Sequence, residues 1–252
     1  MSEVKEAAEA LGVGEPVEKV PARRPDARAL FGRWVTVEPV SEARHGSDLW
    51  QSFAHSDPSG RLWTYLGYGP FAGEAVFRQW LAEREASRDP HFYAIVPRGT
   101  AKAAGMASLM RITPEHGVIE IGHIWLSPRL QQTREATDAV FVIMHHVLDE
   151  LGYRRLEWKC DALNAASRRA ALRLGFTFEG IFRQHMVVKG RNRDTAWFAI
   201  LDKQWPPLRA AFQAWLSDDN FDGKGRQRAA LATFMAPERK PRRKRVATRR
   251  AR

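Results

Sequence analysis

The sequence has only one cysteine, Cys160, in 252 residues. A single thiol cannot form a disulfide within the chain, which excludes a disulfide-stapled secreted domain. No run of 18 apolar residues occurs, so a membrane-spanning helix is not predicted. The first residues, MSEVKEAAEALGVGEPVEK, are acidic and lack the apolar core of a secretory signal. Together these absences predict a cytoplasmic protein without a membrane segment.

Two further classes of site leave no trace in the sequence. There is no ligand spacing typical of zinc, and there is no glycine pattern of the P-loop kind. We therefore expect no metal ion in this protein.

Basic charge is abundant but unevenly spread. The formal net charge is +11, and residues 236–252 hold nine Lys or Arg residues against one Glu. This segment has no aromatic residues between its charges and no motif that reads a nucleic-acid groove. Two interpretations stay open: weak contact with RNA or the ribosome through charge, and a disordered solubilising end.

Hydrophobic periodicity and composition divide the chain into four segments. We expect a flexible leader at 1–29, a folded domain at 30–217, a C-terminal extension at 218–235 and a basic disordered tail at 236–252. Strands are expected at 33–40, 92–96, 103–112, 117–128, 154–164, 179–189 and 195–202. Helices are expected at 43–55, 73–87, 134–151, 165–176 and 205–216.

Strands alternate with helices in the middle of the domain but pair as hairpins at both ends. That order predicts a three-layer α/β/α fold with a central mixed, mostly antiparallel sheet. The most informative stretch runs from Gly117 to Phe176 and reads strand, turn, helix, strand, helix. It brings the carboxylate of Glu120 into an apolar strand and places free N–H groups at a helix start. This arrangement suits a phosphorylated cofactor held beside an acid/base residue.

Three motifs in this stretch resemble a known family. They are EIGHIWLSP at 120–128, Gln131-x-x-Arg134-x-Ala136-Thr137 at the helix start, and Asn164-x-x-Ser167 followed by Gly175-Phe176. In order and spacing they are similar to the acyl-CoA-binding core of the GNAT superfamily of N-acetyltransferases, and more closely to its RimJ/RimL-type branch. The likeness extends over roughly residues 30–205. It implies a GNAT fold and acetyl-CoA as co-substrate.

The resemblance also implies where acetyl-CoA binds. The implied cofactor residues are Ile124, Trp125, Leu126, Gln131, Gln132, Thr133, Arg134, Glu135, Ala136, Thr137, Asn164 and Ser167. The sequence departs from the family at Arg134, where the loop has its first glycine, and Glu135 adds a negative charge near the expected phosphates. From the residues alone, an ordinary helix start without a ligand remains the alternative.

Glu120 is the candidate general base, eleven residues before Gln131, which is the family interval. Strand alternation predicts that Glu120, Gly122, Ile124 and Leu126 share one side, with His123 on the opposite side. A substrate amine with a pKa near ~8 needs only a modest base, acting directly or through water. The alternative is a structural carboxylate that pairs with an arginine at a strand edge.

Asn164 and Ser167 begin the helix after the second strand. Asn164 is a good N-cap, which by itself explains its presence. The resemblance implies that Asn164 binds the cofactor arm and that Ser167 lies near its sulfur. The general-acid tyrosine of many superfamily members would stand at Ala171, so that role is absent here and passes to Ser167 only by analogy.

The aromatic loop at 56–70 supplies the candidate acceptor residues Trp63, Tyr65 and Tyr68, for which an aromatic core plug is the alternative. We therefore expect an acetyl-CoA-dependent N-acetyltransferase that acts on a primary amine, such as a protein N-terminus, and is a monomer or homodimer. Acetylation of a small amine is one alternative. A non-catalytic CoA- or RNA-binding protein is the other, motivated by Arg134, Ala171 and the tail.

Overall fold

The computed structural model describes residues 12–18 and 20–235, so the expected basic tail lies outside the described residues. Eight strands form one sheet in the order β1-β2-β3-β4-β5-β6-β8-β7. Neighbours are antiparallel except β5 and β6, which are parallel, as the expected mixed sheet requires. The strands are β1 Leu30–Phe31, β2 Val35–Pro39, β3 His91–Pro97, β4 Gly105–Thr113, β5 Val118–Leu126, β6 Arg155–Asp161, β7 Thr177–Val188 and β8 Arg191–Leu201.

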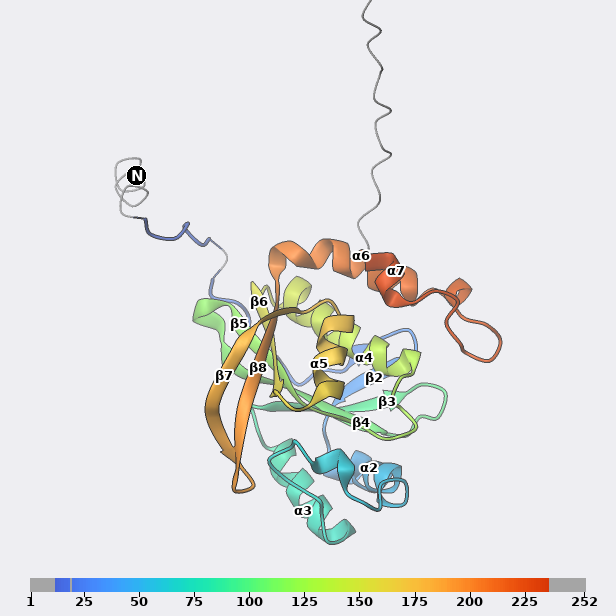
Figure 1. Cartoon of the computed structure of the whole chain (residues 1–252). Coiled ribbons are helices and arrows are strands. Elements are labelled where there is room, and N and C mark those ends of the chain that lie inside the picture. Colours follow the sequence, from blue (N-terminus) through green and yellow to red (C-terminus); the bar gives the residue numbers. More distant parts are fainter. Residues whose placement is uncertain (1–11, 19, 236–252) are drawn as a thin grey trace, which may run out of the picture.

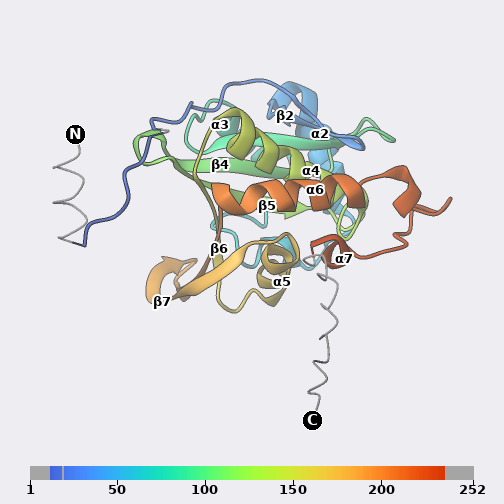
Figure 2. The same cartoon turned by 90° about the horizontal axis from the view of Figure 1, so that it is seen from above.

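Helices cover both faces of this sheet. They are α2 Glu42–Ala54, α3 Glu74–Glu85, α4 Arg134–His145, α5 Ala165–Arg173, α6 Trp205–Trp215 and α7 Leu231–Met235. Figure 1 shows α2 and α3 together below the sheet, with α4, α5 and α6 on its other side. Seen from above, α6 lies beside α4 and is followed by α7 (Figure 2). The expected three-layer α/β/α architecture is confirmed.

Each face of the sheet has its own apolar core. The larger core lies between the sheet and α4, α5 and α6, and includes Ile121, Ile143 and Phe212. The smaller core lies under α2 and α3 and is rich in aromatic rings, among them Phe53 and Phe77. From the loop between α2 and α3, which carries the candidate acceptor residues, this second core buries Trp63 and contacts Tyr68.

The two central parallel strands separate soon after they begin. β5 pairs with β6 only from Val118 to Glu120, opposite Arg155 to Glu157. Beyond that point β6 continues to pair with β8, and β5 continues to pair with β4. Residues 121–126 therefore have a backbone edge that faces an opening in the sheet, and Glu120 stands where the opening starts.

A β-bulge in β5 corrects one prediction. Met106 pairs with Trp125 and Ser108 pairs with Gly122, so β5 has one residue more than β4 in this interval. His123 takes a φ of 49°, which inserts the extra residue and reverses the alternation after Gly122. Trp125, not Ile124, therefore shares the side of Glu120. His123 lies on that side too, with its ring 5.1 Å from Phe92 in the smaller core.

Other differences from the expected elements are local. The long helix ends at His145 and widens into a π-helical turn, His146–Glu150, where Leu151 N–H donates to the carbonyl of His146. The short elements β1 and α7 are not among the expected ones. No helix among the described residues combines the length and apolarity needed to cross a bilayer.

The segments that flank the expected domain pack onto it where the structure describes them. Ala22 N–H donates to Pro114 O at 3.0 Å, and Arg28 pairs with Glu150. In the extension, Leu231 is buried in the larger core and the ring of Phe221 lies 6.5 Å from Trp34. The residues from 22 to 28 thus belong physically to the domain, although the sequence placed them in a flexible leader.

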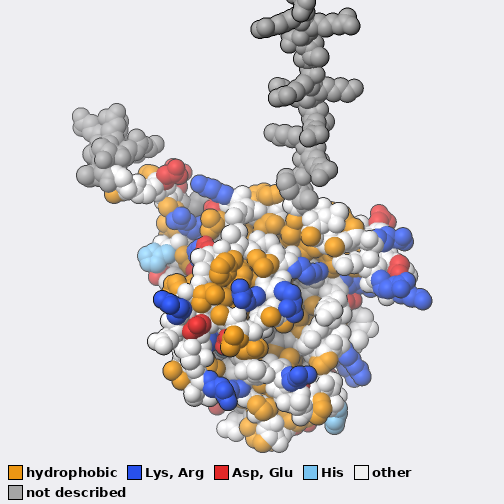
Figure 3. All heavy atoms as spheres, in the orientation of Figure 1, with side chains coloured by type: hydrophobic (Ala, Val, Ile, Leu, Met, Phe, Trp, Pro, Cys, Tyr) orange, Lys and Arg blue, Asp and Glu red, His pale blue; other side chains and the backbone are white. Residues whose placement is uncertain are grey.

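The edge strand β7 leaves apolar side chains uncovered. Phe178, Ile181, Phe182 and Val187 are exposed along it. In the space-filling view, hydrophobic side chains gather on this face with Lys and Arg side chains scattered among them (Figure 3). The β7–β8 hairpin, which carries Lys189, Arg191 and Arg193, therefore has an apolar outer edge.

Candidate active site

The N-terminus of α4 presents a row of free backbone donors. Thr133 caps the helix, because its hydroxyl accepts from Ala136 N–H at 3.1 Å and donates to Leu130 O at 2.7 Å. Within the described part of the chain, the N–H groups of residues 132–135 donate to no other group. Unpaired N–H groups at the positive end of a helix dipole fit a diphosphate. The residues expected at the cofactor loop are therefore arranged as an anion site.

The substitution of glycine by Arg134 is accommodated without strain. Arg134 is the first residue of α4 and has no left-handed φ, so no glycine is needed there. Its guanidinium lies 3.6 Å from the ring centroid of Trp34, away from the free N–H groups. Glu135 Oε1 lies 3.2 Å from Arg134 Nε, so the arginine neutralises the added carboxylate. The ordered side chain belongs to the contact between α4 and the C-terminal extension, where Phe221 also approaches it.

A second arginine near this helix end was not among the expected residues. Arg173, in the last turn of α5, donates from Nη1 to Thr137 Oγ1 at 3.1 Å. It makes no ion pair with any carboxylate of residues 12–18 and 20–235, and burial lowers the pKa of its guanidinium. Positive charge that no described carboxylate neutralises, beside free helical N–H groups, is further support for an anion site. A basic residue just before Leu174-Gly175-Phe176 was the only sequence signal for it.

Asn164 and Ser167 are both held by local structure. Asn164 caps α5, since its Oδ1 accepts from Ser167 N–H at 3.0 Å. The Ser167 hydroxyl accepts from the indole Nε1 of Trp158 at 3.0 Å, which ties α5 to β6. Ala171, at the position where the family tyrosine would stand, is fully buried. No hydroxyl from this position of α5 can therefore serve as an acid.

Glu120 belongs to a buried chain of charges. Its Oε2 lies 3.0 Å from Lys159 Nζ and 3.3 Å from Arg111 Nε, and Lys159 also lies 2.7 Å from Glu157. The side chains of Glu120 and Lys159 are only 6% and 5% exposed. Burial raises the pKa of the Glu120 carboxyl, against the opposing effects of Lys159 and Arg111. The sequence-based alternative, a pair with an arginine, is thus also present in the structure.

Polar residues of β6 and β8 lie on the same face of the sheet as Glu120. Glu120 pairs with Glu157, which shares its side of β6 with Lys159 and Asp161 by alternation. Across to β8, Asp161 pairs with Thr195, whose side also carries Arg193 and Arg191. Polar side chains therefore run continuously from Glu120 to the β7–β8 hairpin.

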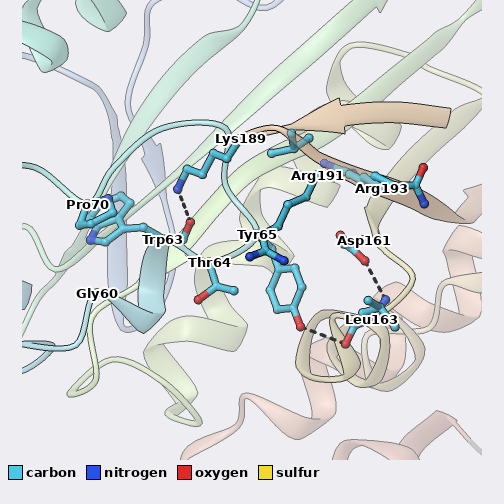
Figure 4. Close-up of a pocket in the computed structure, with 12 residues that line it drawn as sticks. Gly60, Trp63, Thr64, Tyr65, Pro70, Asp161, Leu163, Lys189, Arg191 and Arg193 are labelled. Carbon is cyan, nitrogen blue, oxygen red and sulfur yellow. Dashed lines mark hydrogen bonds between the residues drawn. The ribbon is translucent and has the colours of Figure 1, made fainter. Parts of the chain in front are cut away.

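A cavity of about 530 Å³ lies at the end of this polar face (Figure 4). One wall is the loop between α2 and α3, the second is the turn after β6, and the third is the β7–β8 hairpin. Tyr65 donates its hydroxyl to Leu163 O at 3.2 Å, and Lys189 donates to Trp63 O at 2.8 Å. The lining residues are Gly60, Trp63, Thr64, Tyr65, Pro70, Asp161, Leu163, Val188, Lys189, Arg191, Asn192 and Arg193.

The Acetyltransferase (GNAT) domain family matches residues 27–177 of this sequence. The chain belongs to the GNAT acetyltransferase family. A solved GCN5-related N-acetyltransferase from Brucella melitensis is 47% identical, with a TM-score of 0.84, and the match covers 86% of this chain and 98% of that one. The enzyme is therefore an acetyl-CoA-dependent N-acetyltransferase with a GNAT fold, as the sequence resemblance implied.

More distant relatives fall in the expected branch of the GNAT family. The ribosomal-protein-serine acetyltransferase of Escherichia coli is 33% identical over 101 residues, which cover 40% of this chain and 56% of that protein. The chain thus spans little more than half the length of this curated relative. The structure of RimL, a ribosomal L7/L12 α-N-protein acetyltransferase in complex with coenzyme A, shares the fold at 21% identity and a TM-score of 0.59, covering 70% of this chain and 99% of that one.

The three aromatic residues expected at the acceptor site of this GNAT enzyme have different positions. Tyr65 and Trp63 line the cavity, although Trp63 is 1% exposed and its ring lies 5.4 Å from Trp125 of β5. Tyr68 lies outside the lining and stacks on His123 with ring centroids 5.6 Å apart. Both expected interpretations therefore apply to this loop, which is an aromatic plug on β5 and a cavity wall.

Several residues that line the cavity or contact Glu120 were not identified from the sequence. Lys159, Lys189, Arg191 and Arg193 were missed, and of these Lys159 had a signal, because charges alternate at 157, 159 and 161 in a buried strand. The expected cofactor residues Ile124, Trp125 and Leu126 lie on the free edge of β5, and Leu126 O accepts from Gln131 Nε2 at 3.0 Å. Among residues 12–18 and 20–235, no three His, Cys, Asp or Glu side chains gather as a metal site would require.

Proposed function

We propose that this enzyme transfers acetyl to a primary amine by direct attack within a ternary complex, with Glu120 as general base. The carboxylate of Glu120 carries this proposal, because it is buried at the point where β5 and β6 separate. Glu120 is followed on β5 by the free backbone edge of residues 121–126 and is paired on β6 with Glu157, where the polar face that leads to the cavity begins. A base in this position can take a proton from an amine that enters from the cavity.

Acetyl-CoA supplies an activated acetyl group, and the chain supplies the residues that hold it. The N–H groups of residues 132–135 and the guanidinium of Arg173 would bind the diphosphate and neighbouring phosphate. The free edge of β5 from Ile124 to Leu126 would bind the pantetheine arm, and one of its N–H groups would stabilise the charge that develops on the thioester oxygen. Asn164 would contact the same arm through its side-chain amide, whose oxygen already caps α5.

Proton movement in the proposed reaction needs an acceptor and a donor. The amine loses a proton to Glu120, whose raised pKa makes it a better base at neutral pH than an ordinary carboxylate. The amine nitrogen bonds to the acetyl carbon as the carbon–sulfur bond breaks. The Ser167 O–H would donate a hydrogen bond to the departing thiolate and keep its own proton, since its oxygen accepts from Trp158. The thiolate then takes up a proton from water.

The name of the Escherichia coli relative points to the first acceptors to test. That relative acetylates a ribosomal protein, so peptides with a free N-terminal serine are assayed first, beside amino acids and other small amines. Release of free CoA gives a readout that does not depend on the identity of the acceptor.

Substitution of Glu120 by Gln tests the base. We expect kcat/KM to fall by roughly 10²–10⁴-fold, the usual span for general acid–base catalysis. The affinity for CoA should change little, because Glu120 is not among the groups proposed to hold the cofactor. The loss should shrink at high pH, where more of the amine is already deprotonated.

The matched control is Glu157→Gln, which removes the other carboxylate bound to Lys159. It disturbs the same buried network but leaves Glu120 in place, so its loss of kcat/KM should be much smaller. Equal losses in the two variants would mean that the network, and not a base at 120, supports activity. Thermal unfolding of both variants separates loss of function from loss of the fold.

A further inference from the structure

The cavity that faces the acceptor side is lined by three cations and one carboxylate. The cations are Lys189, Arg191 and Arg193, and the carboxylate is Asp161. None of the three cations forms an ion pair with a carboxylate in the part of the chain that the structure describes. Positive charge that is concentrated in a cavity without an internal counter-ion is suited to an anionic ligand.

The hairpin geometry places these cations on one side. The turn Lys189–Gly190 has φ values of 50° and 72°, and Val188 pairs with Arg191 directly across it. This two-residue turn fixes the register, so alternation puts Arg191 and Arg193 on the same face of β8. In Figure 4 the Arg191 side chain extends from the hairpin into the cavity toward Tyr65.

The nearest acidic side chain of the hairpin is occupied elsewhere. Asp194 accepts from Gln184 N–H at 2.8 Å and from Asn192 Nδ2 at 2.9 Å, on the β7 side of the strand. Arg193 Nε is buried and has no hydrogen-bond partner among the described residues. A buried donor without a partner is costly, and a bound carboxylate or phosphate oxygen would satisfy it.

The acidic and basic residues of the cavity lie on different walls. Asp161 lies at the end of β6, on the polar face that leads back to Glu120, and its Oδ1 accepts from Leu163 N–H at 2.8 Å. The cations stand on the opposite wall, in the hairpin. A small molecule or peptide end that carries an amine and an anionic group could therefore place the amine toward Glu120 and the anion toward the hairpin.

We infer that the acceptor of this enzyme carries an anionic group close to its reactive amine, and that Arg191 and Arg193 bind this group. The inference rests on the proposed acetyl transfer and names its substrate class. The anion can be the α-carboxylate of a free amino acid or an acidic side chain near a peptide N-terminus. Polyamines are disfavoured, because their second charge repels the hairpin cations.

Matched pairs of acceptors test the inference with the full-length enzyme. One pair is an amino acid and its carboxamide, and the other is a serine peptide with Glu or Gln at its second residue. We expect kcat/KM for the anionic member of the preferred pair to exceed that for its neutral partner by about 10- to 100-fold, the range for a charge-assisted hydrogen bond. Which pair shows the difference identifies the source of the anion.

The variants Arg191→Gln and Arg193→Gln should abolish this preference, so that kcat/KM for the anionic acceptor falls to the value for its neutral partner measured with the same variant. Arg183→Gln is the matched control, because Arg183 is an exposed arginine of β7 that does not line the cavity. Two variants are used because the buried Nε of Arg193 risks the fold, whereas Arg191 is exposed. Equal rates for both members of both pairs, or a preference that survives both variants, would overturn the inference.

A binding measurement separates this inference from the proposed reaction. The N-acetylated amino acid and peptide products are compared with their neutral analogues by calorimetry in the presence of CoA. If no amine is acetylated but the anionic products bind more tightly and lose this advantage in Arg191→Gln, the proposed reaction fails and the anion site stands. If neither anionic product binds more tightly than its neutral analogue, the anion site fails, whether or not acetyl transfer occurs.

Discussion

Lys159 holds its ammonium group between two buried carboxylates, Glu120 and Glu157. Its Nζ also lies 3.8 Å from the ring centroid of Trp197, so two carboxylates and an aromatic face all stabilise the cation. The positive charge lowers the pKa of Glu120 against the effect of burial. Lys159 is therefore a positioning residue that sets how readily Glu120 ionises.

Substitution of Lys159 by Met tests this role. Removal of the charge raises the pKa of Glu120 further, so the acid limb of the kcat/KM pH profile should move to higher pH. Breaking a buried ion pair should also destabilise the fold by about 3–5 kcal/mol, measured by denaturant unfolding. Lys159→Arg retains the charge and should leave the limb near its wild-type position. An unmoved limb in Lys159→Met would show that Glu120 is not the group whose titration limits the rate.

At the scale of elements, two helices meet where the cofactor phosphates are expected. The first turn of α4 supplies free N–H groups and the last turn of α5 supplies Arg173. The Arg134 side chain packs on Trp34 and does not contribute to this contact between α4 and α5. In the proposed cofactor site, anion binding would therefore depend on how α5 packs against α4, and not on the residue that replaces the family glycine.

Substitution of Arg173 by Ala should weaken CoA binding by about 10- to 100-fold, because a hydrogen bond to a charged group contributes about 1.5–3 kcal/mol. Calorimetry with CoA, dephospho-CoA and adenosine shows which phosphate is affected. Arg169→Ala is the control, since Arg169 is an exposed arginine of the same helix. Equal affinities of Arg173→Ala and wild type for CoA would remove Arg173 from the site.

At the scale of the whole molecule, we expect the folded domain not to require the basic segment 236–252. Nine of the basic residues lie in 236–252, after α7, the final helix in the described part of the chain, which ends at Met235. A chain that ends after 235 should keep its melting temperature and its kcat for a small amine. If the tail contacts RNA or ribosomes, that contact should fall steeply with salt and disappear on truncation.

The intact chain, assayed in parallel, is the reference for this truncation. Acetyl transfer lost together with the tail would show that residues 236–252 belong to the catalytic domain. Retained transfer with lost RNA binding would assign the tail to partner contact alone.

Local pattern was sufficient for most of the fold. Alternating and helical periodicity predicted β2 to β6, β8 and α2 to α6, because at least one face of each of these elements is buried. β7 has no buried residue and was predicted from its hairpin with β8. β1 and α7 are too short to show a period. The bulge at His123 was not predicted, because the residue with left-handed φ is not a glycine and nothing else in the strand pattern indicates an extra residue.

The candidate site likewise contains residues that the sequence predicted and residues that it did not. Motif spacing led to Glu120, the loop at 131–137, Asn164 and Ser167, which lie in consecutive elements of the chain. Arg173 was missed because its partner, Thr137, is in another helix. Lys189, Arg191 and Arg193 were missed because a basic turn is typical of a solvated loop. Only the structure shows that this turn and the α2–α3 loop line the same cavity.

The sequence by itself determined the family, the strand–turn–helix order and the identity of the candidate base, because these depend on residues close together in the chain. Only the tertiary structure decided the environment of that base. Lys159 and Arg111 come from strands on either side of β5, and burial between them is what alters the pKa of Glu120. The tertiary structure also decided the net positive charge of the cavity lining, because three segments distant in the sequence contribute its residues.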